Sequence, residues 1–111
     1  MMEPPRTIYS FIIVNETGKS LFINYQDINN NQGCDTLNPN RSFMKNMYQF
    51  CFNEYNDTLI KSFFSEMKIR LDTGMLNINP YKRSNWVESK ALRGSGSCKG
   101  GRVCYTLTVY N

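Results

Sequence analysis

The sequence predicts a mainly β protein of 111 residues: a single-domain antiparallel β-sandwich of six or seven strands, with one short helix near residues 58–66. Three observations support this. Short runs of β-branched and aromatic residues alternate with turn-forming residues. The chain is 41% hydrophobic and 14% aromatic, which is enough for a core. No repeat or linker divides it, and two halves would each be too small to hold a core, so residues 1–111 form one domain.

The first half contains three predicted strands. "TIYSFIIV" (7–14) is apolar on both faces, as a central strand is, and "NETGK" and "SLFINYQ" follow it as a turn and a second strand. Together they predict a β-hairpin. Residues 26–40 are polar and Asn-rich, which indicates a loop, and "RSFMKNMYQFCF" (41–52) is a third strand. On one face of that strand lie Met44, Tyr48, Phe50 and Phe52, and on the other Phe43 and Met47.

The second half begins with an ambiguous segment. "NDTLIKSFFSEM" (56–67) has apolar residues at helical spacing, although two short strands would also use its aromatics. From Met67 the period becomes two, and "DTG" turns into "MLNI" (75–78) to give a second hairpin. "WVESKAL" predicts a further strand, "RGSGSCKGG" a loop and "RVCYTLTVY" the last strand. One face of the last strand carries Val103, Tyr105, Leu107 and Val109.

Composition excludes several classes of function. The net charge of +4 is mild and spread along the chain, which disfavours nucleic-acid binding. Without histidine, no Ser-His or Cys-His pair forms, and no motif joins two carboxylates, so the sequence predicts no enzyme and no cofactor. No apolar run reaches the roughly 18 residues of a membrane span. "MMEPPRT" is too polar for a signal peptide, so the protein is either cytosolic or secreted with its signal removed.

The four cysteines favour secretion. Their spacings of 17, 47 and 6 lack the close pairs that zinc sites use, so no metal site is expected and disulfides are favoured. Three connectivities are open, and local pairing predicts Cys34–Cys51 and Cys98–Cys104. The alternative is four thiols, with Cys51 packed as a small hydrophobe.

Two kinds of sequence motif coincide with predicted turns. In "DINNNQGCD", Asp27, Asn29 and Asn31 match a calcium loop, but Gln32 and Asn38 occupy the positions that need Gly and Glu, so a turn is expected. Three glycosylation sequons, beginning at Asn15, Asn40 and Asn56, fall in or beside predicted turns.

The stretch "PYKRSNW" (80–86) is the best candidate for a binding surface. Tyr81 and the only tryptophan, Trp86, suit a bilayer interface, and Lys82 and Arg83 would each add roughly 1 kcal/mol near an anionic surface. Such a loop also suits sugar stacking or a protein contact. The competing interpretation is that Trp86 begins a strand and points into the core, with both cations merely solvated.

Together with "VNETGKSL" and "ESKALRGSGSCKGGRVCYTLTV", this stretch resembles the actinoporin-like family of membrane-binding β-sandwich toxins. The resemblance implies a lipid-headgroup site. The tyrosine-rich stretch of the family is shortened here to Lys82-Arg83, and its pore-forming N-terminal helix has no counterpart before Thr7. The resemblance therefore implies a headgroup binder that does not perforate membranes. It carries over only Pro80, Tyr81, Ser84, Asn85 and Trp86.

A second resemblance is to plant S1-type self-incompatibility proteins, which are small secreted β-sandwiches with four cysteines. It rests on "VNETGKSLFINYQD" and "LNPNRSF", but Tyr25 stands where that family usually has a cysteine. It implies the same architecture and does not fix the function.

These patterns predict a secreted, non-catalytic binding protein. The first hypothesis is a binder of lipid headgroups or membrane surfaces; the second is a ligand or effector that docks on a protein receptor. Pairing between copies through edge strands is a third option, because the terminal "VCYTLTVY" is a strong β segment. The expected binding site comprises Tyr81, Lys82, Arg83, Ser84, Asn85 and Trp86.

Overall fold

In the part of the chain that the structure describes, seven strands and one short α-helix account for most of the residues. The computed structural model describes residues 6–72, 74, 78–94, 96 and 98–110. No helix in these ranges is both long and apolar enough to cross a membrane. The elements are β1 (Thr7–Glu16), β2 (Leu21–Asp27), β3 (Gln32–Leu37), β4 (Ser42–Gln49), α1 (Leu59–Phe63), β5 (Phe64–Leu71), a 3-10 turn η1 (Arg83–Asn85), β6 (Val87–Arg93) and β7 (Gly100–Tyr110).

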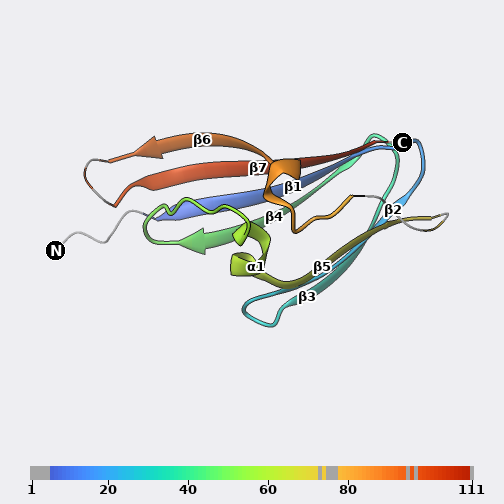
Figure 1. The fold of residues 1–111 in the computed structure, drawn as a ribbon, viewed down its shortest axis with the longest axis horizontal. Coiled ribbons are helices and arrows are strands. Elements are labelled where there is room, and N and C mark those ends of the chain that lie inside the picture. Colours follow the sequence, from blue (N-terminus) through green and yellow to red (C-terminus); the bar gives the residue numbers. More distant parts are fainter. Residues whose placement is uncertain (1–5, 73, 75–77, 95, 97, 111) are drawn as a thin grey trace.

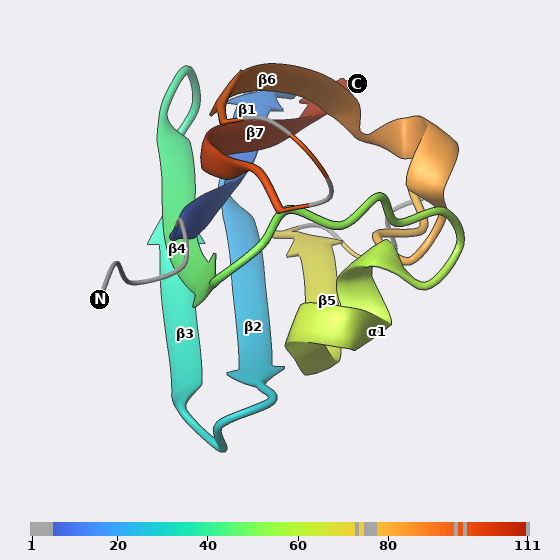
Figure 2. The same ribbon diagram turned by 90° about the vertical axis from the view of Figure 1, so that its left-hand side faces the viewer.

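The strands form two sheets that enclose the core, which confirms the predicted mainly β sandwich (Figure 1). One sheet has four strands in the order β4-β1-β7-β6, and the other has three in the order β3-β2-β5. Figure 2 shows the two layers from the end, with α1 beside β5. The antiparallel prediction needs one correction, because β1 and β7 pair in parallel, with Thr7 opposite Gly101 and Glu16 opposite Tyr110.

The predicted hairpin of the first two strands is wrong. β1 and β2 lie in different sheets, so the turn between them carries the chain from one layer to the other. Asn15 organises this crossing: its side-chain amide donates to the carbonyls of Lys19 and Leu37, and its oxygen accepts from Thr17. A turn whose polar groups are bound this way needs no pairing between its flanking strands.

Two other expectations concern the middle of the chain. The region 26–40 contains β3, which was missed because it is an edge strand whose residues are mostly exposed and polar. The predicted helix exists but is one turn long, from Leu59 to Phe63, and the period-two pattern of β5 begins at Phe64. The predicted "MLNI" strand of the second hairpin lies mostly outside the described residues.

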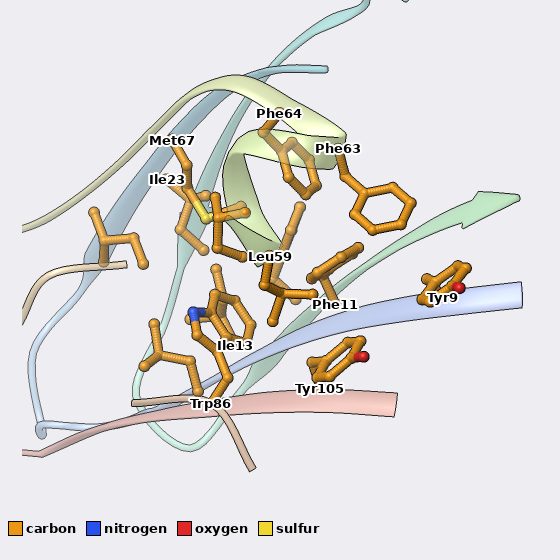
Figure 3. Close-up of a cluster of buried hydrophobic side chains, with 14 of the residues drawn as sticks. Tyr9, Phe11, Ile13, Ile23, Leu59, Phe63, Phe64, Met67, Trp86 and Tyr105 are labelled. Atoms are coloured by element: carbon orange, nitrogen blue, oxygen red, sulfur yellow. The ribbon is translucent and has the colours of Figure 1, made fainter. Parts of the chain in front are cut away.

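The core is aromatic and lies between the sheets (Figure 3). Phe11 is fully buried at its centre, with ring centroids 5.2 Å from Phe63 and 5.1 Å from Phe64. Trp86 meets the same ring edge-on at 5.9 Å. The four residues predicted to share one face of β7 do so, and that face is buried: Val103, Tyr105, Leu107 and Val109.

The predicted cysteine pairs are wrong. One disulfide joins Cys51 to Cys98, with 4.8 Å between their Cα atoms. It ties the segment after β4 to the loop before β7, and Phe52 N–H donates to the Lys99 carbonyl beside it. Cys34 and Cys104 are free thiols, because each lies on the outward-facing side of its strand and the two strands belong to different sheets. Sequence proximity favoured local pairs, but the topology brings distant loops together instead.

Candidate binding surface

Trp86 does not present its indole to solvent. Only 2% of the residue is exposed, and its Nε1 donates to the Pro80 carbonyl at 2.7 Å. This confirms the interpretation that Trp86 points into the core, and it corrects the expectation that the indole is available to a ligand. The hydrogen bond also closes the 80–86 segment on itself.

Two more members of the expected site are engaged within the fold. The Tyr81 hydroxyl accepts a 2.8 Å hydrogen bond from the Met67 N–H. Arg83 donates through Nε to the Tyr55 carbonyl and through Nη1 to the Trp86 carbonyl. Its guanidinium also lies 3.5 Å from a Glu88 carboxylate oxygen and 5.1 Å from the centroid of the Tyr105 ring. Arg83 therefore fixes the segment to the sandwich.

The remaining three members lie at the surface of the same segment. Lys82 and Ser84 are exposed, and Asn85 is half-buried and donates to the Asn79 carbonyl at 2.9 Å. The structure thus keeps the six expected residues together around η1. It leaves only Lys82 and Ser84 open to a partner.

The first part of the calcium-like stretch is a turn, as expected, whereas residues 32–35 belong to β3. Asp27 is 1% exposed, and its carboxylate accepts from the backbone N–H groups of Asn29 and Asn31 and from the Asn31 side chain. Burial raises the pKa of this carboxyl, but those hydrogen bonds and the charge of Lys45 outweigh it and hold the pKa below its usual value. The Asp27 carboxylate is therefore already hydrogen-bonded within its own loop.

A different set of cations and aromatics gathers at one end of the four-stranded sheet. We call this set the cationic end; it lies where β1 and β7 begin and β4 and β6 finish, on the left in Figure 1. All its members are exposed, with Tyr48 at 57% and Phe50 at 60%. Its cations form no ion pair with any described residue. The members are Arg6, Tyr48, Phe50, Arg93, Lys99 and Arg102.

The strand register explains why these residues meet. Tyr48 and Arg102 flank Ile8 in one row across the sheet, and Arg93 pairs with Gly100 at the same end. The Arg6 guanidinium lies 5.7 Å from the centroid of the Tyr48 ring. Residues from distant parts of the sequence thus share one surface; Arg6 and Tyr48, for example, are 42 positions apart.

The disulfide and its neighbours hold this end in shape. The Thr7 hydroxyl lies 3.3 Å from the carbonyls of both Phe50 and Lys99, and the Gly101 N–H donates to the Arg6 carbonyl. The Cys51–Cys98 disulfide links the loop that carries Phe50 to the loop that carries Lys99. The backbone that carries Phe50 and Lys99 is therefore cross-linked and hydrogen-bonded to the start of β1.

Sequence reasoning missed the cationic end because its members are scattered. Each cation stands alone in the chain, whereas Lys82 and Arg83 stand side by side. The alternation of the 41–52 strand did place Tyr48 and Phe50 on one face, opposite the buried Phe43 and Met47. This alternation was the sequence pattern that could have pointed to the cationic end.

Two carboxylates meet at one lysine: Lys90 lies against Glu54 and is 3.8 Å from Glu88. Because Lys90 pairs with both Glu54 and Glu88, the three side chains form an ion-pair cluster between β6 and the segment after β4. Among the described residues, no group of three or more acidic or cysteine side chains is arranged to hold a metal ion.

The three sequons differ in accessibility. Asn15 is fully buried and hydrogen-bonded, so its side chain has no room for a glycan in the folded protein. Asn40 and Asn56 are exposed in turns.

Comparison of the chain with protein-family models, curated proteins and solved structures found no match. The resemblances to actinoporin-like and S1-type proteins therefore stay predictions, and the candidate surface rests on its own chemistry.

Proposed function

We propose that this is a secreted, non-catalytic protein that binds anionic membrane surfaces through its cationic end. The main support is the group of four exposed cations around Phe50 and Tyr48, which have no acidic partner among the described residues. Anionic headgroups attract such cations, and aromatic rings favour the bilayer interface. The Cys51–Cys98 disulfide is compatible with an extracellular protein.

The expected affinity for an anionic membrane is the sum of an electrostatic and a hydrophobic contribution. Four cations contribute roughly 4 kcal/mol near an anionic surface, and burying one phenylalanine adds about 2 kcal/mol. The sum corresponds to a dissociation constant on the order of tens of micromolar. The proposed interaction is therefore reversible and depends on ionic strength.

Co-sedimentation with vesicles tests the proposal. Vesicles containing phosphatidylserine should bind the protein, and pure phosphatidylcholine vesicles should bind it much less. The double variant R93Q/K99Q removes two cations from the end and should weaken binding about 30-fold, since each contributes roughly 1 kcal/mol. F50A should weaken it further, because the ring no longer enters the interface.

The matched control is K68Q/R70Q, which removes two exposed cations from the outer face of the three-stranded sheet. It lowers the net charge equally and should weaken binding much less. Equal losses in both variants would show a non-specific charge effect and contradict the proposal. Tight binding to soluble sulfated glycan that F50A leaves unchanged would show a glycan site instead.

A further inference from the structure

In the part of the chain that the structure describes, no helix or strand covers the outer face of the four-stranded sheet. Even-numbered residues of β1 and β7 point outward, since their odd-numbered neighbours such as Phe11 and Tyr105 are buried. Of the six large hydrophobic residues that are exposed in the described ranges, five stand on this face or at its ends. They are Met44 at 55%, Tyr48 at 57%, Phe50 at 60%, and Val87 and Tyr110 at 71% each.

The middle of this face carries no charge. The register aligns Met44, Ile12, Thr106 and Val87 in one row across all four strands. Charged residues make up 20% of the chain, yet none occurs in this row or in the rows on either side. We call these rows the uncharged band: Ser10, Ile12, Val14, Ser42, Met44, Asn46, Val87, Ser89, Cys104, Thr106 and Thr108.

We propose that the uncharged band is a dimer interface that binds the same face of a second copy of this chain. In a two-fold dimer each surface meets itself, so a charged patch would oppose its own charge, and a patch of uncharged polar and apolar residues avoids that repulsion. The net charge of +4 resides elsewhere on the molecule.

The area of the face suits such a dimer. β1 has 10 residues, so the face is about 33 Å long, and four strands make it roughly 19 Å wide. The uncharged band is the middle of this face, and two faces that met over their whole length would bury on the order of 1,200 Å², which is the lower end of the range for stable interfaces. Two sheets stacked face to face are also the ordinary packing within β-sandwiches.

The charged residues at the two ends of the outer face favour one of the two possible orientations of the dimer. A two-fold axis along the strands would set the cationic end of one copy against that of the other. An axis across the strands instead lays each cationic end over the opposite end of its partner, where Glu16 and Tyr110 stand. The inferred dimer therefore has its strands antiparallel across the interface, with β7 of one copy over β7 of the other.

This orientation brings two thiols together. β7 runs from Gly100 to Tyr110, so its middle is residue 105, and Cys104 stands one residue away on the outer face. Cys104 is free and half-buried. In the dimer, Cys104 of each copy faces the middle of β7 in its partner, within reach of a short cross-linker. With the axis along the strands, β7 would face β1, whose residue opposite is Ser10.

Sedimentation velocity without vesicles tests the inference, using protein from about 1 to 200 micromolar. The wild type should show a concentration-dependent dimer, and M44E/V87E should raise its dissociation constant about 100-fold or more. The matched control I28E/T36E adds the same charge at exposed positions of β3 and its preceding turn, and should leave the dimer unchanged. Thermal unfolding should show both variants folded.

Cross-linking with a short bis-maleimide tests the orientation. The background C34S removes the exposed thiol and leaves Cys104. It should give a covalent dimer, which adding M44E/V87E should abolish.

Three results would overturn the inference: a wild type that stays monomeric throughout, a dimer that M44E/V87E does not weaken, or equal weakening by I28E/T36E. Because this orientation lays each cationic end over the partner, the dimer is the form without membrane, and the vesicle-bound form is the monomer. Vesicle binding is decided by R93Q/K99Q and the dimer by M44E/V87E, so the two proposals fail separately.

Discussion

The 80–86 segment and the cationic end have nearly the same composition and opposite availability. Both combine aromatic rings with cations. In the segment, Trp86 is buried and Arg83 is bound by two carbonyls and Glu88. At the cationic end, Phe50 is 60% exposed and no cation has an acidic partner among the described residues.

The difference shows that composition alone does not identify a binding surface. An aromatic ring and a guanidinium stabilise a fold as readily as they bind a ligand, by filling the core and satisfying carbonyl groups. What separates the two roles is whether each side chain already has partners. Substitutions in the two regions should therefore have different consequences.

Trp86→Ala should lower the free energy of unfolding by about 3–5 kcal/mol, because it leaves a cavity beside Phe11 and removes the bond to the Pro80 carbonyl. Denaturation in urea measures this. Phe50→Ala, the matched change at the cationic end, should alter stability by less than about 1 kcal/mol. If Trp86→Ala were as mild as Phe50→Ala, the indole would not be part of the core.

Stability should fall as the pH rises above about 10. Burial and the nearby Glu88 raise the pKa of Tyr105, and burial raises the pKa of Tyr9. A hydrogen bond to Glu54 raises the pKa of Lys90. All three groups hold their protons more tightly when folded, so their contribution is complete below the unfolded pKa values and is lost at higher pH. Urea denaturation between pH 8 and 11 measures the slope.

Tyr105→Phe should flatten this slope, because the ring packs beside Arg83 but no longer ionises. Tyr110→Phe is the control, since Tyr110 is 71% exposed. An equal change of slope in both variants would contradict the role assigned to Tyr105.

Lys82→Gln should have the smallest effect. The side chain is exposed and solvated, so stability should change by less than about 0.5 kcal/mol and vesicle binding by only a few-fold. Co-sedimentation measures the second quantity. A loss as large as that of R93Q/K99Q would return the 80–86 segment to the candidate surfaces.

Much of the fold was predictable because it depends on local periodicity. Alternation in the 41–52 segment and in β7 sorted most residues correctly by face. The exception is Phe52, which follows the end of β4 at Gln49 and packs against the core instead of lying with Tyr48 and Phe50. β3 was missed because an edge strand with exposed residues carries no apolar alternation. The parallel pairing of β1 with β7 was missed because residues about 94 apart meet, and no local pattern records such a meeting.

The site was less predictable than the fold. The adjacency of Lys82 and Arg83 in sequence drew attention to a segment whose side chains mostly serve the core. The cationic end arises only when four strands align Arg6, Arg93 and Arg102 at one end. Its chemistry is a product of register, which the sequence encodes only through the whole fold.

The parallel pair of β1 and β7 also determines when folding can finish. β7 lies between β1 and β6, so the four-stranded sheet lacks an interior member until residue 110 is available. During synthesis, β1 and β4 can pair early, but one edge of β1 stays open while the rest of the chain leaves the ribosome. Such long-range closure slows folding, and the open edge is exposed to other chains in the meantime. The nascent protein therefore depends on its last strand for protection against aggregation.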